Sequence, residues 1–167
     1  MIKNFDSLFV TMFGLGKIKF MPGTLGSLAT IIFLFFLFHY IKISSSIILI
    51  GLIIVFIYSF YAVSNYIKDK DNKDPGEIII DEFLGQSIPI YLYEISHGME
   101  KEIPEATVYY IIIFFLFRYF DIMKPFPVSF FDKNFKNSFG VIMDDICAGL
   151  YVVLTLVCFM IIKSYVL

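Results

Sequence analysis

The fold is decided by residues 47–66, which read IILIGLIIVFIYSFYAVSNY. This stretch carries no charged residue. About 20 predominantly apolar residues are enough for one helix to cross the hydrocarbon core of a bilayer. We therefore interpret residues 47–66 as a membrane-spanning helix and expect the rest of the chain to be organised around it.

Four further apolar runs lie on either side of this stretch, at residues 28–41, 78–93, 107–117 and 146–162. None of them reaches about 20 residues unless the small or polar residues next to it are counted as part of the span. Short spans are expected where helices pack as a bundle around polar residues, or where one segment is re-entrant. The pattern predicts one domain, residues 1–167, folded as an all-α integral membrane bundle of about four to five apolar helices, some short or re-entrant.

The composition supports a membrane protein. The 167 residues are 59% apolar and 17% charged, whereas an average soluble domain is about 45–50% apolar and about 25% charged. The net charge of −2 excludes the basic footprint of a nucleic-acid-binding protein. Cys147 and Cys158 lie in one apolar run and are expected to be packing residues rather than a disulfide or a zinc site.

The distribution of basic residues predicts the orientation in the membrane. With five spans and the N-terminus in the cytoplasm, ten basic residues fall on the cytoplasmic side and three on the other side. One re-entrant run would reduce the spans to four. The ten are Lys3, Lys17, Lys19, Lys68, Lys70, Lys73, Arg118, Lys124, Lys133 and Lys136, and the three are Lys42, Lys101 and Lys163.

Six carboxylates lie within or against the apolar runs, each at an expected cytoplasmic end. A carboxylate near hydrocarbon is unfavourable by about 2.5–3.5 kcal/mol on insertion scales, so such a residue needs a partner and is a candidate functional residue. Taken singly, some could simply cap helices. Together they predict one polar pocket at the cytoplasmic face, formed by Asp81, Glu82, Asp121, Asp132, Asp144 and Asp145.

The spacing of the charged residues favours a metal and an anion in this pocket. Arg118, Asp121 and Lys124 recur every three residues and would form one stripe on a helix. Taken alone, the two cations could be ordinary cytoplasmic anchors. Several hard oxygen ligands favour Mg²⁺ over zinc or copper. Both histidines, His39 and His97, are expected at the opposite face, away from the pocket.

The segment PGTLGS, residues 22–27, opens the first apolar run with small residues, two hydroxyls and free backbone N–H groups. A helix start of this kind can hold a phosphate through Thr24, Gly26 and Ser27. The alternative is a glycine-containing turn with ordinary Ser/Thr capping. Carboxylates for a metal, cations for an anion and this segment together favour metal-assisted phosphoryl chemistry at a membrane surface.

The motifs in this chain resemble the bacterial phosphatidylglycerophosphatase A family in order and spacing. They are PGTLGS (22–27), DEFLG (81–85), RYFDIMKPFP (118–127), FD (131–132) and GVIMDDICAG (140–149). The resemblance implies a Mg²⁺-dependent lipid phosphatase of the bacterial inner membrane, with its active site facing the cytoplasm. The expected reaction is hydrolysis of phosphatidylglycerophosphate to phosphatidylglycerol and phosphate.

Roles for the candidate residues follow from the motifs and the resemblance together. Asp81, Glu82, Asp121, Asp144 and Asp145 are expected to be metal ligands and catalytic carboxylates. Lys124 and Arg118 are expected to hold phosphate oxygens, with Thr24, Gly26 and Ser27 completing the phosphate site. Attack by water and attack by a carboxylate, giving an aspartyl-phosphate, both remain open at this point.

Two other function classes compete with the phosphatase. A small ion-coupled transporter or channel also places carboxylates within a membrane, but it predicts polar residues reaching the bilayer midplane. A non-enzymatic membrane scaffold predicts that the acids serve only as helix caps. The gathering of the acids at one face favours the enzyme over both.

Overall fold

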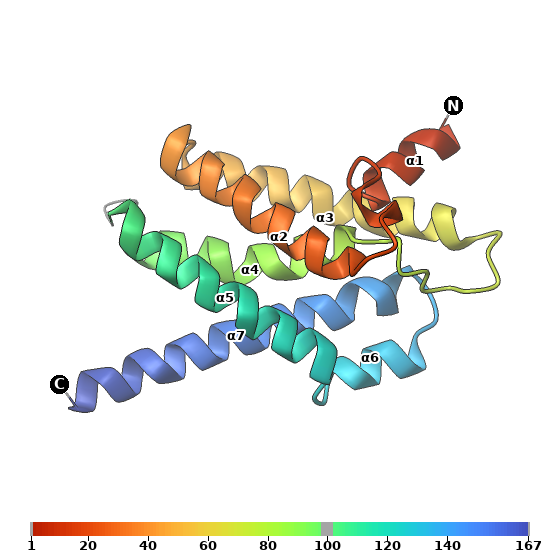
Figure 1. Cartoon of the computed structure of the whole chain (residues 1–167). Coiled ribbons are helices and arrows are strands. Elements are labelled where there is room, and N and C mark those ends of the chain that lie inside the picture. The colour runs from red at the N-terminus through yellow and green to blue at the C-terminus, as the bar shows by residue number, and fades with distance from the viewer. Residues whose placement is uncertain (1, 98–101, 167) are drawn as a thin grey trace.

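The computed structural model describes residues 2–97 and 102–166, and within these residues every regular element is a helix (Figure 1). The helices are α1 (Ile2–Val10), the short η1 (Leu15–Lys17), α2 (Pro22–Phe35) continued by the π-helical turn η2 (Phe36–Tyr40), α3 (Ser45–Ile67), α4 (Ile80–His97), α5 (Ile103–Met123), α6 (Val128–Asn134) and α7 (Ser138–Val166). The predicted all-α class is confirmed.

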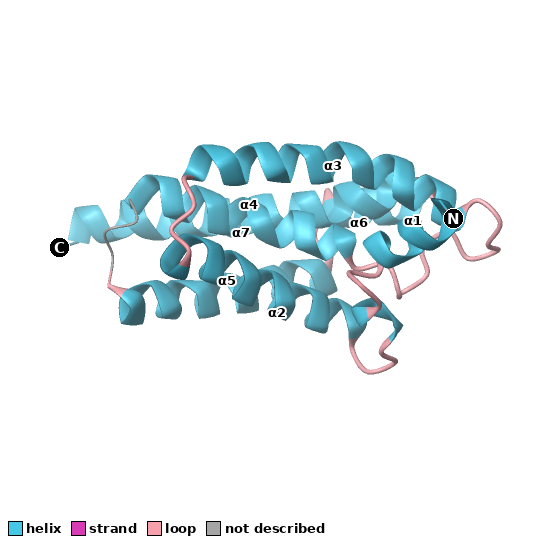
Figure 2. Cartoon of the chain, turned by 90° about the horizontal axis from the view of Figure 1, so that it is seen from above, coloured by secondary structure: helices cyan, strands magenta, loops and turns pink. Residues whose placement is uncertain are grey.

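Five long helices form an elongated bundle in which successive helices run in opposite directions (Figures 1 and 2). By length and composition, four of them could cross a membrane: Pro22–Tyr40, Ser45–Ile67, Ile103–Met123 and Ser138–Tyr165. Each apolar run of the sequence falls on one long helix, although α5 continues past its run to include Arg118 and Asp121. The predicted membrane bundle is therefore confirmed.

Helix α4 is the inner element of the bundle, and its polar residues keep it out of the four candidate spans. Ile79, Ile90 and Gln86 are completely buried along it. It starts beside the acids at one end of the bundle, and its Glu94 contacts His39 of η2 at the other end. The third apolar run thus extends along the whole bundle rather than turning back on itself.

Helices α4 and α7 cross at two glycines, Gly85 and Gly149. A Cβ built on Gly149 would collide with the carbonyl oxygen of Gly85, and a Cβ on Gly85 would collide with the carbonyl oxygen of Asp145. Small residues allow helix backbones to approach this closely, as is common in membrane bundles. The crossing brings the first turn of α4 against the segment of α7 that carries Asp144 and Asp145.

Two short helices, α1 and α6, lie at the end of the bundle where α2, α4 and α7 begin (Figure 1). The sequence did not predict either one as a helix. Helix α1 packs on α3, where the buried Asp6 accepts hydrogen bonds from the Tyr58 hydroxyl at 2.6 Å and from the Asn65 amide at 3.2 Å. Helix α6 packs on α7 through an aromatic cluster in which Phe131 and Phe135 stack on each other and both contact Phe139 edge-on.

The two ends of the bundle differ in charge. The loops and short helices at the α1 and α6 end carry most of the lysines, whereas Lys42 follows η2 and Lys163 lies near the end of α7, both at the opposite end (Figure 1). Lys101 and the side chains of Lys3 and His97 lie outside the described residues. The segregation agrees with the predicted grouping of the basic residues.

Candidate active site

Three carboxylates meet where α4 begins and α7 crosses it. Asp81 and Glu82 lie in the first turn of α4, and Asp145 lies one turn before Gly149 on α7. One oxygen from each of the three lies within 4.8 Å of the others. We call these three residues the acid cluster. A helix N-terminus favours negative charge, which helps to place two of the carboxylates here.

The acid cluster is buried and has unused bonding capacity. Asp81 is 7% exposed and Asp145 is 4% exposed. Within the described residues, Glu82 Oε2 and Asp145 Oδ1 have no hydrogen-bond partner. Buried carboxylates this close together repel one another and require a compensating positive charge. Hard oxygen donors in this arrangement fit a divalent cation of the Mg²⁺ type.

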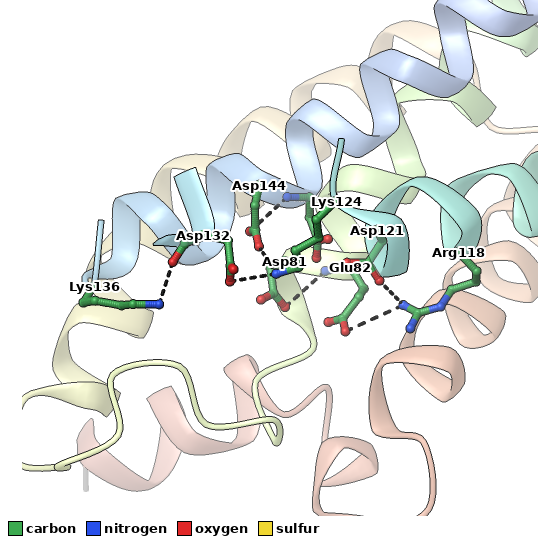
Figure 3. Close-up of polar contacts among 9 residues, drawn as sticks. Asp81, Glu82, Arg118, Asp121, Lys124, Asp132, Lys136 and Asp144 are labelled. Atoms are coloured by element: carbon green, nitrogen blue, oxygen red, sulfur yellow. Dashed lines mark hydrogen bonds and ion pairs between the residues drawn. The ribbon is translucent and has the colours of Figure 1, made fainter. Parts of the chain in front are cut away.

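Arg118 approaches the acid cluster from α5. Its Nη1 lies 2.6 Å from Asp121 Oδ2 and 4.0 Å from Glu82 Oε1 (Figure 3). The same nitrogen lies 3.5 Å from the Oγ of the buried Ser27. The start of α2 is equally near, because a Cβ on Gly23 would collide with Glu82 Oε1. The N-termini of α2 and α4 and the last turns of α5 therefore converge on one point.

Lys124 completes the site from the end of α5. It has a left-handed backbone conformation with φ of 43°, which ends the helix and turns the chain toward α6. Its ammonium donates to Asp132 Oδ1 at 2.8 Å and to Asp144 Oδ2 at 2.9 Å (Figure 3). Arg118 and Asp121 therefore lie together on one face of α5, as predicted. Lys124 lies just beyond the end of α5 and instead binds Asp132 of α6 and Asp144 of α7.

The Lys124 ion pairs shift the pKa values of their members. Burial alone would lower the pKa of Lys124, but its hydrogen bonds with Asp132 and Asp144 raise it above its ordinary value. Partial burial would raise the pKa of Asp132, but the bond to Lys124 and the nearby Lys136 and Lys133 lower it below its ordinary value. The ammonium of Lys124 and the carboxylate of Asp132 are therefore both charged around neutral pH.

The structure divides the five expected metal ligands into two groups. Asp81, Glu82 and Asp145 form the acid cluster. Asp121 and Asp144 instead form ion pairs with Arg118 and Lys124.

The expected phosphate-binding segment contacts the site at two residues. Ser27 is buried beside Arg118, and a Cβ on Gly23 would collide with Glu82 Oε1. Thr24 lies half-buried in the first turn of α2. Gly26 is buried, and a Cβ built on it would contact Ile79.

Sequence reasoning missed two residues near the site. Asp74 is exposed but lines a small cavity together with Asp132, Lys136 and Asp144. Its loop is held in place at the base by an ion pair between Lys70 and Glu77. Gln86, a polar residue within an apolar run, is completely buried one turn beyond Glu82. Its position in that run was the one sequence signal available.

Comparison with known proteins now identifies the chain's family. The family model described as phosphatidylglycerophosphatase A matches residues 8–160, and these residues include every motif of the site. The chain belongs to the phosphatidylglycerophosphatase A family. As a member, it is a phosphatase that hydrolyses a phosphomonoester. The predicted family and enzyme class are confirmed, and the membership favours the enzyme over the transporter and the scaffold.

The relatives are similar over most of their length. A phosphatidylglycerophosphatase A of Haemophilus influenzae is 36% identical over 143 residues, which are 85% of this chain and 80% of the relative. The Escherichia coli phosphatidylglycerophosphatase A is 32% identical over 139 residues, 82% of this chain and 73% of the relative. A Bacteroides thetaiotaomicron protein named "Putative phosphatidylinositol-3-phosphatase" is 34% identical over 147 residues, 84% of each chain. No solved structure matches the chain.

Proposed function

We propose that this chain is a Mg²⁺-dependent phosphatase that converts phosphatidylglycerophosphate to phosphatidylglycerol and phosphate at the cytoplasmic face of the bacterial inner membrane. The observation that carries the proposal is the acid cluster, with its two unpartnered carboxylate oxygens, next to Arg118 and Lys124 at one end of a membrane bundle. The names of two relatives in the family supply the substrate.

The acid cluster would hold the cation. Asp81, Glu82 and Asp145 offer only oxygen donors, and their buried position explains why a charge of opposite sign is required there. When bound, a divalent cation polarises phosphoryl oxygens and lowers the pKa of a bound water. Asp121 and Asp144 flank this site and form ion pairs with Arg118 and Lys124.

Arg118 and Lys124 would bind the substrate phosphate without releasing their carboxylate partners. An ammonium has three N–H donors, and Lys124 uses two of them on Asp132 and Asp144, so one is left for a phosphate oxygen. Arg118 has five donors, and its Nε has no partner among the described residues. The hydroxyl of Thr24 and the first N–H groups of α2 add neutral donors to the same oxygens.

Hydrolysis requires a nucleophile on phosphorus and a proton for the leaving glycerol oxygen. We assign the attack to water, which would give up a proton to a carboxylate of the site as it bonds to phosphorus. That carboxylate would pass the proton to the glycerol oxygen as the bond from phosphorus to this oxygen breaks. Arg118 and Lys124 would stabilise the charge that develops on the phosphoryl oxygens. A covalent aspartyl-phosphate is the competing route, and acid-quenching the enzyme with radiolabelled substrate would reveal it as label retained on protein.

The deciding experiment is phosphate release from phosphatidylglycerophosphate in detergent micelles, with Mg²⁺ and with a chelator. We expect release with Mg²⁺, loss of release with the chelator and recovery when Mg²⁺ is restored. Asp145→Asn is the inactive control, because it removes an oxygen ligand of the acid cluster. A transporter or scaffold would give no release under any condition. Phosphatidylinositol 3-phosphate forms a second substrate arm, and faster release from it would overturn the substrate assignment.

A further inference from the structure

Gln86 is a buried polar residue that the proposed mechanism does not use. It lies on α4, one helical turn after Glu82, and its side chain is completely buried. Neither its amide oxygen nor its amide nitrogen has a hydrogen-bond partner among the described residues. Leaving a buried polar group unpaired destabilises a folded protein. An amide with both ends unpaired therefore indicates a polar neighbour that is present in the working enzyme.

Helix geometry places Gln86 on the same side of α4 as Glu82 of the acid cluster. Residues i and i+4 share one helix face, and the Cα–Cβ bond of a helical residue tilts toward the N-terminus of its helix. Gln86 therefore lies one turn from Glu82 on one face of α4, and Glu82 Oε2 is also buried and unpartnered in this part of the chain. The acid cluster lies at that same N-terminus.

The adjacent residue, Ser87, shows that a buried polar side chain on α4 can be satisfied by its own helix. Ser87 is also buried on α4, but its hydroxyl donates to the carbonyl oxygen of Phe83 at 2.6 Å. The serine is thus satisfied by its own helix, whereas the glutamine is not. To satisfy this amide, the groups around Gln86 must include an acceptor for its N–H and a donor for its oxygen.

We propose that Gln86 is a positioning residue of the cation site. Its amide oxygen accepts a hydrogen bond from a water on the cation, and its Nε2 donates to the carboxylate of Glu82. A hydrated divalent cation held by three carboxylates presents this pair of groups to Gln86, because its waters are donors and its ligands are acceptors. The inference rests on the proposed function, since it requires that the acid cluster binds a cation.

The test measures cation binding rather than turnover alone. Mn²⁺ binding is followed by electron paramagnetic resonance on the full chain purified in detergent, for the wild type, Gln86→Met, Gln86→Glu and Ser87→Ala. We expect Gln86→Met to weaken Mn²⁺ binding about tenfold, the lower end of effects measured for residues that support metal ligands. Gln86→Glu keeps an oxygen at the position and should bind at least as tightly as the wild type. Ser87→Ala is the matched control and should bind like the wild type.

Thermal unfolding of the cation-free proteins separates this role from a structural one. Replacing an unpaired buried amide by the similarly sized Met removes a desolvated polar group, so Gln86→Met should unfold at the wild-type temperature or above it. Weaker Mn²⁺ binding by a variant that is at least as stable as the wild type supports the proposal. Wild-type affinity in Gln86→Met overturns it, and so does a loss of affinity that Ser87→Ala shares.

The proposed function and the role of Gln86 fail in different ways. If the wild type binds Mn²⁺ and releases phosphate while Gln86→Met binds equally well, only the role of Gln86 is lost. If the wild type binds no Mn²⁺ and releases phosphate in the presence of chelator, the metal-dependent function is overturned together with the role of Gln86.

Discussion

Gly149 of α7 packs against the carbonyl oxygen of Gly85 in α4, one helical turn beyond Asp145 and Asp81 on their respective helices. The closest approach of the two backbones therefore lies directly beneath the acid cluster. Any residue larger than glycine at this crossing would push the helices apart, and with them the carboxylates.

Gly149→Ala should lower both stability and activity. The added Cβ would collide with Gly85, and overpacking of this kind typically costs about 1–3 kcal/mol. We expect a lower unfolding temperature in detergent and slower phosphate release. Gly51→Ala on α3 is the matched control, because a Cβ there meets nothing within 4 Å. Equal behaviour of the two variants would contradict a packing role for the glycine crossing.

Asp121→Asn should separate catalysis from cation binding. Asp121 pairs with Arg118 at 2.6 Å and lies outside the acid cluster. The variant should therefore retain Mn²⁺ binding while phosphate release falls by about 100-fold, because Arg118 loses the charge that orients it. Asp145→Asn should lose both. Near-normal turnover by a folded Asp121→Asn protein would remove Asp121 from the active site.

Asp132→Asn should destabilise the protein in a pH-dependent way. The pKa of Asp132 is lowered in the folded state, so its stabilising effect is present above its ordinary pKa of about 3.9 and is lost as pH falls through the lower value. Because the pKa of Lys124 is raised in the folded state, its stabilising effect is full below its ordinary pKa of about 10.4 and is lost only as pH rises through the higher folded-state value.

The wild type should consequently be more stable than Asp132→Asn by about 1 kcal/mol from about pH 5 to 9, with the difference shrinking in stronger acid. Unfolding temperatures of both proteins across this range test the expectation. Lys133→Gln, at an exposed position beside Asp132, controls for a general change of surface charge. If the stability difference between the wild type and Asp132→Asn instead grew as pH fell, the stabilising role of the Asp132–Lys124 ion pair would be contradicted.

The sequence predicted the membrane bundle and the gathering of charges, because both follow from local patterns. A run of apolar residues indicates its own helix, and acids at the ends of such runs must share a membrane face. The sequence could not predict which carboxylate groups lie close together in the site. The separation of Asp144 from Asp145 depends on the crossing of α4 over α7, and the turn of Lys124 toward Asp132 depends on its left-handed backbone.

The same limit explains the missed elements. Helix α1 has nine residues and α6 has seven, too short for a periodic pattern to stand out, and both are stabilised by contacts with α3 and α7. Gly26 looked like part of a phosphate-binding turn because its motif is continuous in sequence. The packing of Gly26 beside Ile79, which follows from the approach of α2 to the start of α4, is not visible in that motif.

The orientation in the membrane can be tested with introduced cysteines. In a Cys158→Ser background, which removes the exposed native cysteine, Lys133→Cys marks the active-site end and Ser46→Cys marks the opposite end. If the site faces the cytoplasm, a membrane-impermeant maleimide should label Ser46→Cys in intact spheroplasts and Lys133→Cys only after lysis. The reverse pattern would place the active site outside. Labelling of both proteins in detergent is the control for accessibility.

The buried contact at the far end of the bundle should affect stability without affecting the chemistry. Glu94 on α4 lies 3.1 Å from His39 Nε2 and accepts a hydrogen bond from the Tyr110 hydroxyl at 2.9 Å, so it joins η2, α4 and α5. Glu94→Leu leaves both partners buried and unpaired, and we expect a loss of about 1–3 kcal/mol. Tyr110→Phe removes one hydroxyl only and should lose about 0.6 kcal/mol, the average for such bonds between membrane helices.

Activity per folded molecule and the Mg²⁺ dependence should match the wild type in both variants, because the contact lies at the opposite end of α4 from the acid cluster. Unfolding temperature and phosphate release at a temperature where both proteins are folded are the two measurements. If Glu94→Leu keeps its stability but loses Mg²⁺-dependent turnover, Glu94 acts on the reaction along α4. Its role would then be more than joining three helices.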